Sequence, residues 1–297
     1  MALPPRRLPS VRAALAARRP ALDTLYHGYN AVHVVSDPIW IVRRFERTDD
    51  REVVGFCAAA LAFGRVQSVL QSIEGLLAVM GASPAAFVRA FEPERDSPAL
   101  SHLVHRWTRG DDLSALLWVL RQMLDGHGSI EGFFAAGDEP AAETIQPGLE
   151  SFSARALALD VSAVYGRRRP KPGVGYFFSK PSSGGACKRL NLYLRWMVRR
   201  DEVDLGVWQR VRPGRLVVPL DTHVIRVGRC LGLTTYRSPG WRMAVDITRS
   251  LRALDPEDPI KYDFSICHVG MMGACGFGTA RGDANCPLKG ACRPKRR

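Results

Sequence analysis

Apolar residues recur along most of this chain at the spacing of an α-helix. The clearest example is the run from Arg65 to Met80, where valine, leucine and isoleucine return every three or four residues and would form one buried face. Glycine, proline or aspartate interrupts the pattern between one run and the next. The pattern predicts further helices over residues 21–29, 38–45, 49–63, 100–107, 113–124, 130–136, 141–164, 186–200, 222–231, 240–254 and 259–273. No segment keeps the alternation of a strand, so we expect an all-α fold.

Residues 166–183 form the one long stretch without this periodicity. The stretch holds three aromatic residues in a row and five cations: Tyr176, Phe177, Phe178, Arg167, Arg168, Arg169, Lys171 and Lys180. Long irregular segments in compact domains are often functional. One interpretation is a DNA contact, in which the cations hold phosphates and Phe177 stacks beside a flipped nucleotide. The other is a solvated connection whose aromatic side chains cover the core.

Composition indicates one large folded body. At 297 residues and 46% hydrophobic composition, the chain can bury a sizeable core. We divide it into a basic N-terminal arm (1–20), a helical domain of two lobes with the site between them (21–264), and a C-terminal part with a cysteine-rich basic tail (265–297). No apolar run approaches the ~18 residues of a transmembrane helix. The arginine-rich, acid-free residues 1–20 also fit a transit peptide, although a solvated arm on a cytoplasmic protein is our interpretation.

The charge balance changes the picture most. A net charge of +13 and an isoelectric point near 9.9 indicate a polyanionic partner, because clustered cations supply the sequence-independent attraction to phosphates. A GC-rich genome would explain the preference for arginine over lysine, but not the excess of positive charge. The few lysines leave few candidates for an amine nucleophile: Lys171, Lys180, Lys188, Lys261, Lys289 and Lys295.

Two helix starts carry candidate catalytic groups. Gly184 and Gly185 precede the helix in which Lys188 would occupy the first turn, where backbone N–H groups lack intrahelical partners and can hold a phosphate. Asp221 follows Pro219 and precedes an apolar helical pattern, which predicts that it is an N-cap. A lysine and a carboxylate at two helix starts on a cationic protein suit Schiff-base chemistry on a sugar.

The same residues carry a resemblance. The segment Pro219-Leu220-Asp221-Thr222-His223-Val224, followed by Arg226 and Leu231-Gly232-Leu233, resembles the helix-hairpin-helix DNA glycosylases of the endonuclease III superfamily. The segments ACKRLNLYLRWMVR, PLDTHV and DPIKYDF are similar to a bacterial family of uncharacterised proteins placed in that superfamily, over about Leu25 to Phe264. The resemblance implies a degenerate helix-hairpin-helix within the two-lobed bundle and a catalytic aspartate at Asp221. It also implies a catalytic lysine at Lys188.

The hairpin departs from the usual pattern. In the superfamily the lysine stands two residues after the second glycine of a Leu-Pro-Gly-Val-Gly motif, whereas Lys188 stands three residues after Gly185 and no leucine-proline precedes it. The spacing from Lys188 to Asp221 is longer than usual and is similar to that of archaeal 8-oxoguanine DNA glycosylases. That likeness suggests an oxidised purine as the excised base.

The resemblance also implies a base pocket and a DNA surface. The run AAALAFGRVQSVLQS resembles the glycosylase helix pair whose turn lines the pocket, which would place Phe63, Arg65 and Gln67 near the substrate. Trp196 would stack on a base, and Arg189 and Arg226 would meet phosphates. The alternative for the turn is a plain pair of core helices with Gln67 exposed, and for Trp196 it is packing.

Cysteines crowd the C-terminus. An odd total of seven indicates a reducing compartment rather than disulfides. The end of the chain is similar to the [4Fe–4S] loop of endonuclease III-type glycosylases, but Asp283 stands where its second cysteine would be. The candidate ligands of a [4Fe–4S] cluster are Cys267, Cys275, Cys286 and Cys292. Zinc and free thiols are the alternatives.

Together these features predict a base-excision DNA glycosylase that also acts as an AP lyase. It would work as a monomer on double-stranded DNA with a damaged base, through a Schiff base on Lys188. No cofactor would be needed for the chemistry. Two alternatives stay open: a monofunctional glycosylase in which Lys188 clamps a phosphate, and a non-catalytic DNA- or RNA-binding protein on the same scaffold.

Overall fold

The computed structural model of the protein describes residues 15–29, 34–35, 37–166, 172–271 and 286–291. The fold is 62% helix and 2% strand, which confirms the predicted all-α class. No single helix of these residues is long and apolar enough to span a bilayer. Helices α5 (Val66–Met80) and α6 (Pro84–Ala90) are long and apolar enough only when taken together, and the pair is bent by 62°.

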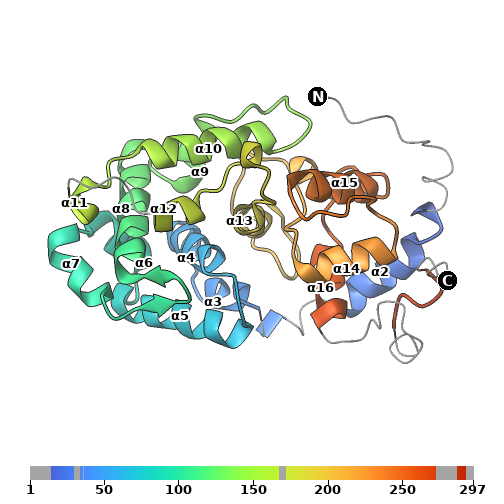
Figure 1. Cartoon of the computed structure of the whole chain (residues 1–297), viewed down its shortest axis with the longest axis horizontal. Helices are drawn as coiled ribbons and strands as arrows, with labels where there is room; N and C mark the ends of the chain where they lie inside the picture. Colours follow the sequence, from blue (N-terminus) through green and yellow to red (C-terminus); the bar gives the residue numbers. More distant parts are fainter. Residues whose placement is uncertain (1–14, 30–33, 36, 167–171, 272–285, 292–297) are drawn as a thin grey trace.

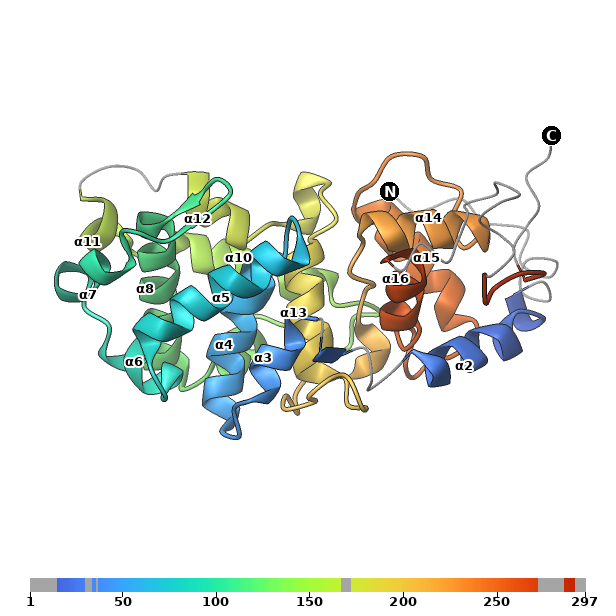
Figure 2. The ribbon, with the colours of Figure 1, turned by 90° about the horizontal axis from the view of Figure 1, so that it is seen from below.

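The helices form two groups along the long axis of the molecule (Figure 1). The larger lobe contains α3 (Ile39–Arg43), α4 (Thr48–Ala60), α5 (Val66–Met80), α6 (Pro84–Ala90), α7 (Pro93–Leu100), α8 (Gly110–His127), α9 (Ile130–Ala135), α10 (Gln146–Ala158), α11 (Ser162–Tyr165) and α12 (Pro172–Phe177). The smaller lobe contains α2 (Arg19–Gly28), α14 (Thr222–Cys230), α15 (Trp241–Arg252) and α16 (Asp263–Met271). Helix α13 (Lys188–Val198) lies between them, as the second view also shows (Figure 2).

Both ends of the described chain contribute to the smaller lobe. The Tyr262 hydroxyl donates to Asp23 Oδ1 at 2.6 Å, which ties the chain just before α16 to α2. The predicted basic arm is therefore too long at its C-terminal end. Leu15 is only 2% exposed and α2 already begins at Arg19, so residues 15–20 belong to the folded body rather than to a solvated arm.

Helix α13 is fixed mainly by packing on α4. The rings of Phe56 and Tyr193 meet edge to face at 5.0 Å between centroids. A Cβ at Gly55 would lie 2.8 Å from the Cε of Met197, so the absence of a side chain at position 55 lets the two helices approach closely. This contact sets the position of α13, and with it that of Lys188.

The predicted helix over residues 100–107 is wrong. Helix α7 ends at Leu100, and a two-stranded antiparallel hairpin follows, with β1 (Val104–His105) and β2 (Thr108–Arg109). The reason is tertiary: His105 is buried at 3% exposure, and its Nε2 and Nδ1 lie 2.9 Å from the Phe63 carbonyl oxygen and from Ser72 Oγ. Local periodicity does not reveal contacts with residues so distant in the chain.

Other boundaries also differ from expectation. The helix expected over 141–164, with an interruption near Pro147-Gly148, is two helices, α10 and α11, and the break between them lies at residues 159–161. The stretch expected to be irregular contains α12 and a 3-10 turn, Pro181–Ser183. The last helix begins at Asp263 and not at Pro259, and the Asp258 carboxylate accepts hydrogen bonds from Arg199 Nε at 2.8 and 2.9 Å. Asp263 therefore lies in the first turn of α16 rather than in its middle.

Candidate active site

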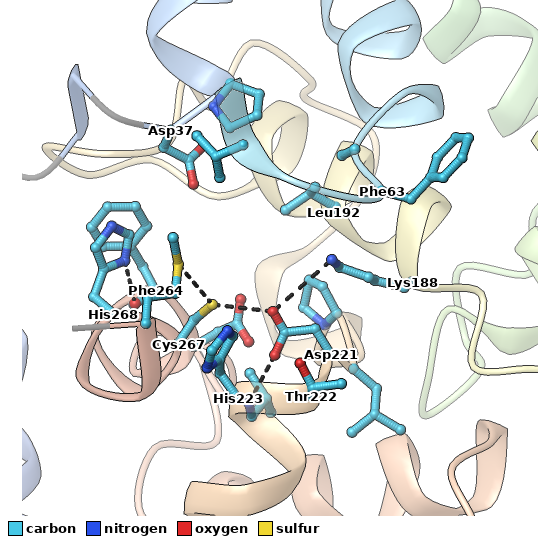
Figure 3. A pocket seen from close by; sticks show the side chains of 18 of the residues that line it. Asp37, Phe63, Lys188, Leu192, Asp221, Thr222, His223, Phe264, Cys267 and His268 are labelled. Atoms are coloured by element: carbon cyan, nitrogen blue, oxygen red, sulfur yellow. Dashed lines mark hydrogen bonds and ion pairs between the residues drawn. The ribbon is translucent and has the colours of Figure 1, made fainter. Parts of the chain in front are cut away.

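A pocket of about 500 Å³ lies between the two lobes and is lined by both. The larger lobe contributes the residues before α3 and the turn between α4 and α5, and α13 contributes its exposed face. The smaller lobe contributes the start of α14 and one side of α16. Figure 3 shows these side chains from close by. The volume is within the range typical of sites for small ligands.

Lys188 is the first residue of α13 and points into this pocket (Figure 3). The preceding residue, Cys187, has the left-handed conformation with φ 48°, which turns the chain sharply into the helix. The Lys188 side chain is 37% exposed, and its Nζ lies 3.9 Å from Asp221 Oδ2. The amine is thus both reachable from outside and paired with the predicted carboxylate. The structure brings together the two residues on which the sequence interpretation depends.

Asp221 uses its two carboxylate oxygens for different purposes. Oδ1 accepts a hydrogen bond from the Val224 backbone N–H at 2.8 Å, which confirms the predicted N-cap of α14. Oδ2 faces the pocket and is the oxygen nearest to Lys188. The carboxylate is 15% exposed. The cap therefore fixes the orientation of the group and leaves the other oxygen facing the pocket.

The thiol of Cys267 completes this constellation. Its Sγ donates to Asp221 Oδ2 at 3.2 Å. Burial, together with the neighbouring Asp221 carboxylate, raises the pKa of the Cys267 thiol well above its ordinary value, so the group is a neutral donor at physiological pH. Cys267 therefore lies in the pocket beside the Lys188–Asp221 pair, and its role as a metal ligand stays a prediction. Sequence reasoning gave Cys267 to the cysteine tail because α16 brings it to Asp221 only in the folded chain.

The other predicted metal ligands are not assembled in the described part of the chain. Cys275 and Cys292 lie outside the described residues, and Cys286 is buried at 6% exposure. Among the residues that the structure describes, no group of three or more potential ligands is close enough to hold a metal ion. A [4Fe–4S] or zinc site in the tail stays a prediction.

Charged groups line the pocket behind the Lys188–Asp221 pair. Arg195 and Asp263 both line it, and their side chains are each 3% exposed and joined by a 2.6 Å contact between Arg195 Nη1 and Asp263 Oδ2. Asp263 Oδ1 is buried without a hydrogen-bond partner among the described atoms. Burial raises the pKa of Asp263 to about 6, although Arg195 acts in the opposite direction. Asp263 thus lines the same pocket as the Lys188–Asp221 pair.

An aromatic wall faces these groups. Phe63 lines the pocket from the turn after α4, as expected. The Arg189 guanidinium lies 5.2 Å from the Phe63 ring centroid and donates to the Ala60 carbonyl oxygen at 3.2 Å. Burial lowers the pKa of Arg189 to about 10. Arg189, predicted to contact DNA, thus packs beneath the aromatic wall of the pocket.

Several other predicted site residues lie elsewhere. Trp196 and Phe177 are 0% and 1% exposed and belong to the core, so their assignment to the base pocket is wrong. Helical periodicity shows which side chains share a face, but not whether that face lines a pocket or is covered by another helix. Arg65 and Gln67 are exposed at the start of α5 and do not line the pocket, unlike the residue between them, Val66.

The predicted DNA contacts divide into three sets. Gly184 and Gly185 are exposed on the connection to α13, and Gly184 accepts a hydrogen bond from the Trp241 N–H at 3.1 Å. Arg226 is exposed on α14, and Lys180 is partly exposed just before the 3-10 turn. The remaining members lie outside the described residues: Arg167, Arg168, Arg169 and Lys171.

Comparison with known proteins places this pocket in a family. A family model described as "Protein of unknown function (DUF2400)" matches residues 37–272. The chain belongs to this family. The family region contains every residue that lines the pocket, from Asp37 to Met271, and excludes Cys275, Cys286 and Cys292. Neither the curated proteins nor the solved structures contain a match to the chain.

Proposed function

We propose that this protein is a DNA glycosylase of base-excision repair that also acts as an AP lyase, with Lys188 as the nucleophile. The observation that supports the proposal most is the juxtaposition of an accessible amine and a fixed carboxylate. Lys188 Nζ lies 3.9 Å from Asp221 Oδ2, inside a pocket of about 500 Å³ between two lobes. A nucleophile within reach of a proton acceptor is the arrangement that covalent catalysis requires.

The charge of the protein supports DNA as the substrate. The chain has a net charge of +13, which favours a polyanion such as the phosphate backbone of DNA. A sugar C1′ within a stacked duplex is out of reach of a pocket side chain, so the nucleotide has to rotate out of the helix. The aromatic and apolar walls around Phe63 and Phe264 suit a flat base, and the opening beside Lys188 suits its sugar.

The chemistry follows from the two groups. The free amine of Lys188 attacks C1′ while the bond from C1′ to the base nitrogen breaks, and the bonding electrons leave with the base. Asp221 Oδ2 stabilises the cationic sugar and accepts a proton from the attached nitrogen. The departing base anion takes up a proton from water. Asp221 returns its proton to the ring oxygen as the bond from C1′ to that oxygen breaks, which gives a protonated Schiff base. Loss of a C2′ proton to water then breaks the bond from C3′ to its oxygen, and the 3′ phosphate leaves with those bonding electrons. An oxidised purine such as 8-oxoguanine is the proposed base.

Borohydride trapping tests the role of Lys188. Wild-type protein should form a covalent adduct with a duplex that contains 8-oxoguanine or an abasic site, because borohydride reduces the Schiff base. Lys188→Ala should lose the adduct completely, and Lys188→Arg should lose it too, since a guanidinium keeps the charge but forms no Schiff base. Lys289→Ala, which removes an exposed lysine outside the pocket, is the matched control and should trap normally.

The rival functions give other results. If Lys188→Arg releases the base as fast as wild type and neither protein is trapped, Lys188 is a phosphate clamp and the enzyme is monofunctional. If wild type binds these duplexes but releases no base from any of a panel of lesions, the protein is a non-catalytic binder. Asp221→Asn keeps the cap and should slow base release by at least about 100-fold, because it removes the charge that stabilises the transition state.

A further inference from the structure

An exposed aromatic surface extends outward from the pocket. Trp107 is 51% exposed and stacks on Phe63, with 4.6 Å between ring centroids and 25° between planes. Tyr176 of α12 is 49% exposed, and its ring centroid lies 6.1 Å from that of Trp107. Because Phe63 also lines the pocket, the three rings form one continuous surface from inside the pocket to the outside. Large aromatic side chains are seldom left this exposed without a partner.

The surface is built on a rigid support. Trp107 and Arg106 form the two-residue turn of the β1–β2 hairpin, beside α5 and α12. Thr108 and His105 are 3% exposed, and the two ring nitrogens of His105 bind the Phe63 carbonyl oxygen and Ser72 Oγ. The hairpin cannot move away from Phe63 without breaking these buried hydrogen bonds.

The turn itself has an unfavourable residue. Arg106 has φ 54°, a left-handed conformation that two-residue hairpin turns usually give to asparagine, aspartate or glycine. Gly64 has φ 101°, and a Cβ there would lie 3.0 Å from Arg106 Nη1, so the backbone opposite makes room for the arginine side chain. Arg106 therefore occupies its position at the expense of backbone preference, which is typical of functional positions.

The chemistry of the surface favours a nucleobase. The guanidinium of Arg106 lies 5.4 Å from the Trp107 ring centroid, and that of Arg189 lies 5.2 Å from Phe63. Aromatic faces alternating with guanidinium groups bind stacked bases and their phosphates together. A purely apolar protein partner would leave the exposed Arg106 without a counter-charge, whereas a nucleic acid supplies both the flat base and the anion.

We propose that the Arg106–Trp107 turn is a wedge that stacks on a nucleobase at the mouth of the pocket. Trp107 fills the gap that an extruded nucleotide leaves in the duplex, and Tyr176 extends the stacking surface. Arg106 neutralises the adjoining phosphate. This inference rests on the proposed function only in taking DNA with a displaced nucleotide as the ligand, and it does not require the Lys188 chemistry.

The test measures binding without catalysis. The probe is a duplex with a tetrahydrofuran analogue of an abasic site, which lacks one base and has no glycosidic bond to cleave. Binding to this abasic-analogue duplex is compared with binding to the same duplex fully paired. Trp107→Ala should weaken binding to the abasic-analogue duplex about 10-fold to 100-fold. Binding to the fully paired duplex should change little. Trp107→Phe retains a stacking ring and should bind nearly as wild type does.

A matched control lies in the same hairpin. Val104 is 53% exposed, and Val104→Ala removes exposed apolar area without removing a ring. The wedge proposal is wrong if Trp107→Ala binds the abasic-analogue duplex as tightly as Val104→Ala does. It is also wrong if wild type binds this duplex no more tightly than the fully paired one. If borohydride traps the wild-type protein through Lys188 but binding does not depend on Trp107, only the wedge proposal is overturned. Trp107-dependent binding without any trapping or base release would overturn the enzyme and keep the wedge.

Discussion

The two ends of α13 carry basic side chains on one helix face and hold them differently. At the C-terminal end, Arg195 and Arg199 are each 3% exposed. Their guanidinium groups contact a set of aspartates at 2.6–3.1 Å: Asp201, Asp204, Asp258 and Asp263. These contacts join α13 to the following loop and to the smaller lobe.

At the N-terminal end, Lys188 is held loosely. Its side chain is 37% exposed, and its Nζ lies 3.9 Å from the Asp221 carboxylate, whose other oxygen accepts a hydrogen bond from the backbone of α14. A buried guanidinium with several short contacts resists any rearrangement, because opening the pair leaves uncompensated charges. A half-exposed amine can leave its partner at little cost. One end of the helix therefore fixes the position of the lobes, and the other is available for substrate.

The largest difference is expected in stability. Arg199→Ala should lower the free energy of unfolding by about 3–5 kcal/mol, because it leaves buried carboxylates without a counter-charge. Urea unfolding measures this. Arg200→Ala, one residue further and exposed, should change stability by less than about 0.5 kcal/mol. Equal effects of the two substitutions would mean that the buried network does not support the fold.

A second, smaller effect concerns pH. Burial raises the pKa of Asp263 to about 6 from 3.8, so the folded protein binds this proton more tightly than the unfolded chain does. The stabilising contribution is then full below about pH 3.8 and is lost as the pH rises through about 6. Asp263→Asn does not titrate, so wild type should lose about 1–3 kcal/mol relative to the variant across that rise.

Measuring the free energy of unfolding of both proteins at about pH 5 and pH 8 gives the sign of this pH effect directly. If wild type instead gains stability over Asp263→Asn as the pH rises, attraction to Arg195 outweighs burial. The pair would then be an ordinary structural ion pair, and the contrast with the Lys188 end would be larger still.

The smallest effect on stability is expected at the Lys188 end of α13. Lys188→Ala should change the free energy of unfolding by less than about 1 kcal/mol, because the side chain is partly solvated and its ion pair is long. The same protein that fails to trap should therefore unfold normally. A loss of several kcal/mol would show that Lys188 supports the fold, and the absence of trapping would then say little about chemistry.

Local pattern predicted much of this molecule. Proline, glycine and capping residues placed the start of α14 at Asp221, since an N-cap depends on its own side chain and the next three residues. Helical spacing placed α5 and α13 to within two residues at each end. The hairpin at Trp107 was missed, because its buried partners are Phe63 and Ser72, which are distant in the chain.

One face of α13 shows which features follow from the sequence and which depend on the tertiary structure. This face carries Lys188, Leu192, Arg195 and Arg199. Helical periodicity alone established that these side chains share a face and point away from the apolar stripe of α13. It could not establish what covers that face. The smaller lobe buries Arg195 and Arg199 and leaves Lys188 open beside Asp221 and Cys267. The reason is that the helical repeat is a local property of the sequence. Which elements cover each face of a helix depends on the tertiary packing of the whole chain.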